Sequence, residues 1–178
     1  MKRGLAILIF GILIFEITGC AHHIQIQKDF VAEAQLLPEL NMTSPVSIVV
    51  KAHDLTGEVE FCNALMAKCW VNYSDLADYA VQSMVDIFNR NHVRVMDGAE
   101  KKLTVSIARA SCDEEVNGIK FNMDIDVTAG EEPTRTFSGY QRSWSAHGFN
   151  FSVTAAVLNA VIEMFEDKEI KHYLEGRQ

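Results

Sequence analysis

Four cysteines, Cys20, Cys62, Cys69 and Cys112, are the side chains of this 178-residue chain with the widest chemistry. A thiolate acts as a nucleophile where a helix N-terminus or a nearby histidine lowers its pKa. The residues around Cys62 and Cys69 do not match the surroundings of such nucleophiles in papain-like peptidases. The six-residue gap between these two is also poor for structural zinc, whose ligands usually come in pairs about two to four residues apart. We therefore expect neither catalysis nor a metal site from these thiols.

Carboxylates form a second group with possible chemistry. Asp124 and Asp126 share one face of a predicted strand, and an acidic run, 113–115, precedes that strand. Calcium needs several converging oxygens, and this run lacks the glycine-containing ligand pattern of a calcium loop. A solvated acidic face is favoured instead, and no cofactor is expected. Solvated or capping roles are likewise favoured for the six histidines, His22, His23, His53, His92, His147 and His172.

The first twenty residues are typical of a secretory signal. Lys2 and Arg3 give it a positive start, and the following run, 4–15, is apolar. That run is too short for a spanning helix, which needs about 20 apolar residues. The segment then ends in the four residues Ile17, Thr18, Gly19 and Cys20.

This ending resembles the bacterial lipobox, in which an aliphatic residue and two small residues precede an obligatory cysteine. The resemblance implies that the Cys20 thiol carries diacylglycerol, that residues 1–19 are removed, and that the new amino terminus is acylated. Two or more acyl chains anchor a protein stably in a membrane. Ala21 in place of aspartate implies transport to the outer membrane of a Gram-negative bacterium. The alternative is a plain signal peptide that happens to end in cysteine.

The charge of the chain argues against nucleic acid as a partner. The formal net charge is −8, and loss of residues 1–19 leaves 14 basic and 23 acidic residues, a net charge of −9. A surface that neutralises phosphates needs a basic stripe. The longest basic run here is Lys101-Lys102.

An exported chain meets an oxidising compartment, so the three remaining cysteines are candidates for one disulfide. A bond between Cys62 and Cys69 would close the smallest loop and is favoured. Two alternatives stay open: a bond from either residue to Cys112, or three reduced and buried thiols.

Two surfaces could bind a partner. Tyr140, Arg142 and Trp144 fall at two-residue spacing on one face of a predicted strand, and these residue types are enriched at interaction hot spots. The guanidinium could lie over an aromatic ring; ordinary packing is the alternative. On the last predicted helix, Leu158 and Ile162 lie outside the main apolar stripe. An apolar arc this wide implies deep burial or a docked partner.

The elements that position these residues are predicted from periodicity. Residues 20–45 show no sustained period, so we expect a lipidated N-terminus and an extended tether. A single domain is expected over 46–178. Its predicted elements are a strand over 46–53, a loop over 57–70, a helix capped by Ser74 or Asp75 that stops near 89–91, a short strand over 93–96, strands over 103–107, 119–127 and 136–145, and a helix with apolar positions from 153 to 165.

Two local features are predicted inside this domain. The alternation is lost after Ile107, which indicates a β-bulge near 108–109 or the end of the strand. The pair Asn117-Gly118 favours a hairpin with a type I′ turn, which needs positive φ at both residues.

The order β-α-β-β-β-β-α predicts an α+β two-layer sandwich, with a mostly antiparallel sheet of four to five strands and two helices on one face. Together with the lipobox and the tether, this order over roughly 46–175 resembles the YajG-like small bacterial outer-membrane lipoproteins. More distantly it is similar to LptE and to auxiliary lipoproteins of ABC transport systems. The segment 57–70 departs from that pattern.

The resemblance implies a periplasm-facing accessory protein that is not an enzyme. Its lipid anchor at Cys20 would hold it to the membrane, and its partner would be an envelope protein or a glycolipid. The alternative is a component of lipid or lipopolysaccharide transport resembling LptE, which predicts an apolar cleft or an exposed hydrophobic patch between the sheet and the last helix.

Overall fold

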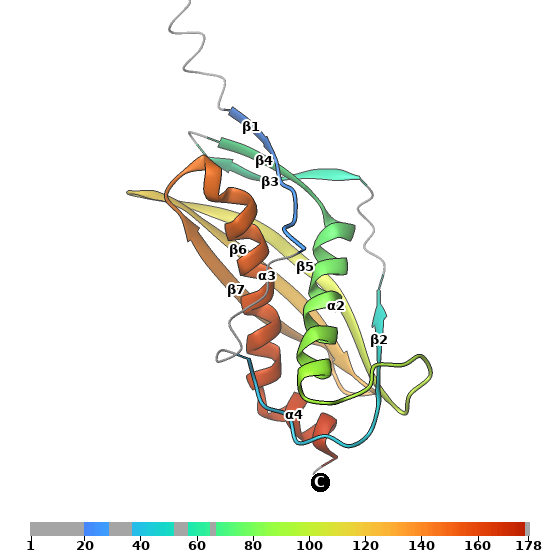
Figure 1. The fold of residues 1–178 in the computed structure, drawn as a ribbon. Coiled ribbons are helices and arrows are strands. Elements are labelled where there is room, and N and C mark those ends of the chain that lie inside the picture. The colour runs from blue at the N-terminus through green and yellow to red at the C-terminus, as the bar shows by residue number, and fades with distance from the viewer. Residues whose placement is uncertain (1–19, 29–36, 52–56, 65–66, 177–178) are drawn as a thin grey trace, which may run out of the picture.

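The structure is a computed structural model that describes residues 20–28, 37–51, 57–64 and 67–176 (Figure 1). The predicted signal segment, with Ile17, Thr18 and Gly19, lies outside the described residues, as does His53. The elements are β1 (Cys20–His23), β2 (Val46–Val50), β3 (Glu58–Ala64), β4 (Ala67–Asn72), α2 (Tyr73–Arg90), β5 (Lys101–Glu115), β6 (Gly118–Ala129), β7 (Arg135–Ser143), a 3-10 helix η2 (Ala146–Gly148), α3 (Phe149–Glu166) and α4 (Lys168–Glu175).

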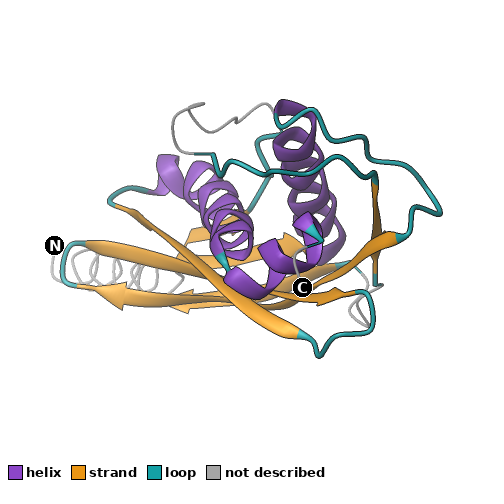
Figure 2. Cartoon of the chain, turned by 90° about the horizontal axis from the view of Figure 1, so that it is seen from below, coloured by secondary structure: helices purple, strands orange, loops and turns teal. Residues whose placement is uncertain are grey.

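The fold is an α+β sandwich, as predicted. The larger sheet has the order β2-β5-β6-β7, with β2 parallel to β5 and the other pairs antiparallel. A smaller sheet has the order β1-β4-β3. The helices lie on one side of the strands (Figure 2). In β6 every second residue from Ile119 to Ala129 is buried, so one face of the larger sheet meets the core and the other meets solvent.

The long β5–β6 hairpin contains the predicted bulge, because the register shifts between Ile107 and Arg109. The predicted turn type is wrong. The hairpin does turn before Gly118, but neither Asn117 nor Gly118 has a positive φ. Gly118 is required for a different reason, since a Cβ there would lie 2.3 Å from the carbonyl oxygen of Ser143.

The predicted helix boundaries are nearly correct. The N-cap of helix α2 is Asn72 rather than the expected Ser74 or Asp75, because the Asn72 side chain accepts from the Ser74 N–H (3.0 Å). It ends at Arg90, with Asn91 as its C-cap. The short strand expected over 93–96 is reduced to one bridge between Val46 and Val95.

Helix α3 packs directly on β7. A Cβ at Gly139 would lie 2.1 Å from the Ala156 carbonyl oxygen, so only glycine allows this approach. Side chains of α3 also bind the outer backbone edge of β7. Glu163 accepts from the Ser138 N–H (2.7 Å), and Asn159 donates to the Tyr140 carbonyl oxygen (2.9 Å). The edge of the larger sheet at β7 is therefore occupied by a helix.

The segment 57–70 was expected to be a loop, and this is wrong. Its described parts form the antiparallel hairpin of β3 and β4, with a register shift between Glu60 and Cys62. The hairpin leads straight into α2. The second sheet of the fold is built on this hairpin, and the first strand of the chain completes it.

Candidate functional site

Residues 20–28, here called the N-terminal strap, are folded against the domain rather than extended away from it. Strand β1 pairs in parallel with β4, so that Cys20 lies opposite Ala67 and His23 opposite Trp70. The N–H of Ile24 continues this ladder by donating to the Trp70 carbonyl oxygen (2.8 Å), and the Ile24 side chain is buried. The expected free tether is therefore wrong for this part of the chain.

Beyond β1 the strap is held by side chains of α3. The N–H of Gln25 donates to Asn150 Oδ1 (3.2 Å), and the N–H of Gln27 donates to Thr154 Oγ1 (3.0 Å). Thr154 is fully buried, and its hydroxyl donates in turn to the Asn150 carbonyl oxygen (2.7 Å). A buried hydroxyl oxygen is costly to leave unpaired. The strap thus lies between β4 and α3 and satisfies a polar atom of the core helix.

Aromatic contacts fix the two histidines of the strap. The His22 ring meets Phe149 edge-on, with centroids 5.1 Å apart, and the His23 ring stacks on Trp70 at 5.6 Å. His23 Nδ1 also lies 2.8 Å from a carboxylate oxygen of Glu58. His22 and His23 were expected to be a solvated dipeptide. The His22 side chain is instead half-buried against the domain, whereas the His23 side chain stays exposed, at 61%. His92, His147 and His172 are exposed.

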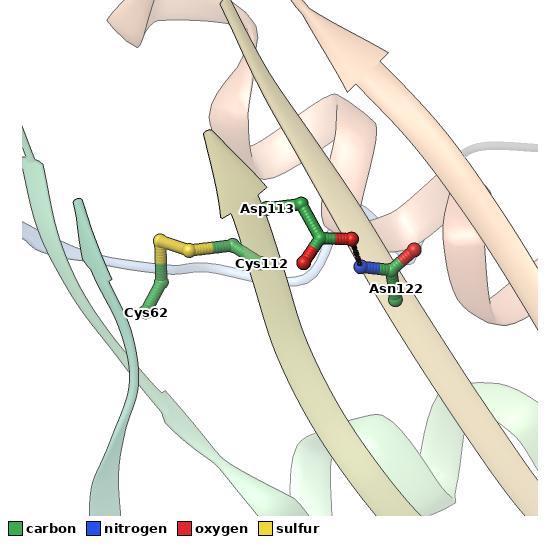
Figure 3. The surroundings of a disulfide bond; sticks show 4 residues. All are labelled: Cys62, Cys112, Asp113 and Asn122. Carbon is green, nitrogen blue, oxygen red and sulfur yellow. Dashed lines mark hydrogen bonds between the residues drawn. A yellow bond between two sulfur atoms is a disulfide. The ribbon is translucent and has the colours of Figure 1, made fainter. Parts of the chain in front are cut away.

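The disulfide joins the two sheets. It links Cys62 of β3 to Cys112 of β5, with a Cα–Cα distance of 5.2 Å (Figure 3). The favoured pairing of Cys62 with Cys69 is wrong. Those two residues are opposite each other on neighbouring strands, but Cys112 lies across the junction of the sheets and takes the bond.

Cys69 is a free cysteine, and its side chain is fully buried. Burial raises the pKa of this thiol to about 11, because the thiolate would lose its hydration. At neutral pH the group is therefore protonated and a poor nucleophile. This cysteine acts as a small apolar core residue.

The expected aromatic surface is only partly as predicted. Tyr140 and Arg142 do share the solvent face of β7, and Trp144 follows the strand end. The guanidinium does not cover a ring. Arg142 pairs with Glu115 (Nε to Oε2, 2.7 Å), and this hydrogen bond raises the pKa of Arg142. The cation over the Tyr140 ring is Lys120, with Nζ 4.5 Å from the centroid.

The wide apolar arc of the last helix is explained by burial. Helix α3 has buried side chains at Ser152 to Leu158 without interruption, and Ile162 is half-buried against the core. Of the two alternatives for this wide arc, deep burial or a docked partner, Leu158 therefore shows deep burial. The region 146–166 is long and apolar enough to cross a membrane, by length and composition alone. Because 67% of the most apolar 18-residue stretch of this region is buried inside the protein, α3 has the character of a core helix.

The acidic face of β6 is occupied by cross-strand hydrogen bonds. Asp124 accepts from the Ser138 hydroxyl (2.7 Å) and Asp126 from the Thr136 hydroxyl (2.6 Å). Asp113 accepts from the Asn122 amide (2.9 Å), as Figure 3 shows. Within the described ranges, no three His, Cys, Asp or Glu side chains are placed to share a metal ion. The carboxylates stabilise strand pairing.

A hollow of about 360 Å³ lies where the strap meets the tips of both sheets. Its wall includes His22 of the strap, residues 114–119 around the β5–β6 turn, and residues 143–146 with Phe149 at the start of α3. Buried core side chains lie between the larger sheet and the helices, among them Phe88 and Phe165, whose rings meet edge-on at 5.1 Å.

Residue patterns contained signals for two of the missed features. In the strap, Ile24 and Ile26 alternate with glutamines, and both pack toward the core. In β3, Val59 and Phe61 alternate with glutamates. Both runs are shorter than the strands that are easily recognised from alternation.

No protein-family model and no curated protein matches this chain. Among solved structures, it is similar to protein XCC0632 from Xanthomonas campestris, of the family DUF330. The sequence identity is 13% and the TM-score 0.48, over 89% of this chain and 98% of that one. Function is therefore proposed from the chain's own residues.

Proposed function

We propose that this protein is a lipid-anchored lipoprotein of the bacterial cell envelope, with its domain facing the periplasm, and that it binds or helps to assemble another envelope component without catalysing a reaction. One observation carries the proposal. The strap that starts at Cys20, the residue at which the lipobox predicts cleavage and acylation, is hydrogen-bonded to β4 and α3. Cleavage before Cys20 would thus leave every described strand intact and place the acylated residue directly beside the domain.

The disulfide supports export. A bond between Cys62 and Cys112 persists in oxidising compartments such as the periplasm and is rare in the cytosol. The state of the cysteines also supports a non-enzymatic role. Two are oxidised and the third is buried with a raised pKa, so none of these three thiols is suited to nucleophilic attack.

Metabolic labelling with a palmitate analogue tests the anchor. The wild-type protein should incorporate the label and fractionate with outer membranes, whereas Cys20→Ser should lose both properties, because only a thiol forms the thioether. Cys69→Ser is the matched control, since it removes a different cysteine and should leave the label in place. Label that persists on Cys20→Ser would contradict the proposal.

Crosslinking in whole cells tests the binding role. A photoreactive residue at position 140, on the solvent face of β7, should trap an envelope protein or a glycolipid. The same residue at position 96, at the opposite end of the molecule, is the control. Hydrolysis of peptidoglycan by the purified protein, lost in Cys69→Ser, would instead favour an enzyme.

A further inference from the structure

Three segments that are distant in sequence meet at one end of the molecule, here called the Cys20 end. It consists of Cys20, the β5–β6 turn at 116–117 and the β7–α3 connection at 144–148. The register explains the meeting, because Ile119, just after the turn, pairs with Ser143, just before the connection. All three segments lie at the upper end of Figure 1, opposite the C-terminus.

The Cys62–Cys112 disulfide brings the strap to this same end. Cys20 lies opposite Ala67, which pairs with Ala64 at the tip of the β3–β4 hairpin. Two residues before Ala64, Cys62 is bonded to β5, which reaches its own tip at Glu115. Strand β1 therefore starts level with the tips of both hairpins.

The two most exposed large hydrophobic side chains of the described residues are both at the Cys20 end. Val116 is fully exposed, at 101%, and Trp144 is 70% exposed. They border the hollow of about 360 Å³ that also reaches His22 of the strap. Two bulky apolar groups at the same tip indicate a contact surface rather than scattered exposure.

The strap is bound to the domain immediately after Cys20, so no free linker separates Cys20 from the fold. The hydrogen bonds of Ile24, Gln25 and Gln27 hold it to β4 and α3 within a few residues of Cys20. An acyl chain attached at Cys20 would consequently enter the membrane directly beside the folded body. A bilayer at that point would meet the Cys20 end first.

We propose that the Cys20 end rests on the lipid surface, with Val116 and Trp144 at the level of the headgroups; this rests on the anchoring proposed above. Tryptophan favours this zone because its ring is apolar while its N–H can bond to water or headgroups. The neighbouring carboxylate of Glu115 is paired with Arg142, which lowers its repulsion from anionic lipids. The contact is shallow, because exposed Glu114 also belongs to the tip.

Tryptophan fluorescence tests this orientation. The protein is purified with its lipid and reconstituted into vesicles of phosphatidylethanolamine and phosphatidylglycerol that contain lipids brominated near the headgroup. Bromine quenches a nearby indole, so the wild-type emission should fall at least about twofold more than that of Trp144→Phe, if the ring lies at the interface. Trp70 is present in both proteins, so the difference reports Trp144.

The matched control adds a tryptophan at the other end. Met96 is 49% exposed and lies beside the start of β2, near the far end of β5. Strand β5 has 15 residues, so its ends are on the order of 45 Å apart. The double variant Trp144→Phe/Met96→Trp should be quenched no more than Trp144→Phe.

A second measurement needs no substitution. Hydroxyl radicals generated outside the vesicles oxidise accessible Trp and Met side chains, and each rate is divided by its rate in the unfolded protein. Trp144 should then be more protected than Met96, the reverse of their order of exposure in the free fold.

The two proposals fail differently. If the protein floats with the vesicles but Trp144 is neither quenched nor protected, the anchor stands and the Cys20 end faces something else, such as another protein or a second copy. If the wild-type protein does not stay with vesicles at all, anchoring fails and the orientation fails with it.

Discussion

Cys69 illustrates how position decides what a thiol does. It lies directly across from Cys62, yet Cys62 bonds to Cys112 and Cys69 stays reduced inside the core. Its burial raises the pKa to about 11 from an ordinary value of 9.0. The folded protein therefore holds this proton over a pH range in which the unfolded chain releases it.

The stability contributed by the Cys69 proton should be present below pH 9 and lost as the pH rises toward 11. A two-unit shift corresponds to at most about 2.7 kcal/mol. Between pH 8.5 and 11, the free energy of unfolding of wild type should fall by on the order of 2 kcal/mol more than that of Cys69→Ala, measured by urea denaturation. If the free energy of unfolding fell equally with pH in the two proteins, burial would not be what holds the proton on Cys69.

At the scale of elements, alternation that continues over many residues was predicted well, whereas alternation over only a few residues was missed. Strand β6 alternates over many residues, and the bulge near 108 follows from a visible loss of phase. The β3–β4 hairpin was missed because its strands are short and a register shift at Glu60 interrupts them. The disulfide partner could not be predicted, since it depends on how two sheets meet.

The disulfide should be a large part of the stability of the smaller sheet. The residues that it joins are 50 apart in sequence, for which the chain-entropy model gives roughly 4 kcal/mol. The double variant Cys62→Ser/Cys112→Ser should lower the free energy of unfolding by about 2–5 kcal/mol. Adding a reductant should lower the free energy of unfolding of the wild type by the same amount, and it should leave that of the variant unchanged. A reductant effect that remains in the variant would indicate another bond.

Gly139 is the second element-scale test. Alanine there would press its Cβ against the backbone of α3, so Gly139→Ala should cost about 3 kcal/mol or more of unfolding free energy. The neighbouring variant Tyr140→Ala changes an exposed side chain on the other face and should cost no more than about 1 kcal/mol. Similar losses in both variants would mean that α3 moves freely away from β7.

At the scale of the whole molecule, the strap would make the proposed anchor at Cys20 continuous with the domain. A free tether would let the domain tumble relative to its attachment, whereas the hydrogen bonds to α3 fix the direction in which the chain leaves the fold. The sequence of the strap shows only two isoleucines in alternation, too short a pattern to predict this docking.

Loosening the strap should expose it without unfolding the domain. The double variant Asn150→Ala/Thr154→Val removes the acceptors for the N–H groups of Gln25 and Gln27. Because two hydrogen bonds of roughly 1 kcal/mol each are lost, amide hydrogen exchange of residues 24–28 should speed up at least about tenfold. Exchange in β6 should stay unchanged. Asn159→Ala, on the same helix but facing β7, is the control and should leave the strap protected.

The helix that covers the edge of β7 also affects how copies of this chain can associate at high local concentration. Proteins confined to a surface meet their copies far more often than in solution, and an open strand edge then becomes a template for fibril growth. Here the Ser138 N–H and the Tyr140 carbonyl oxygen are already bound by Glu163 and Asn159. Copies of this chain could thus be packed densely in one plane without their larger sheets joining through β7.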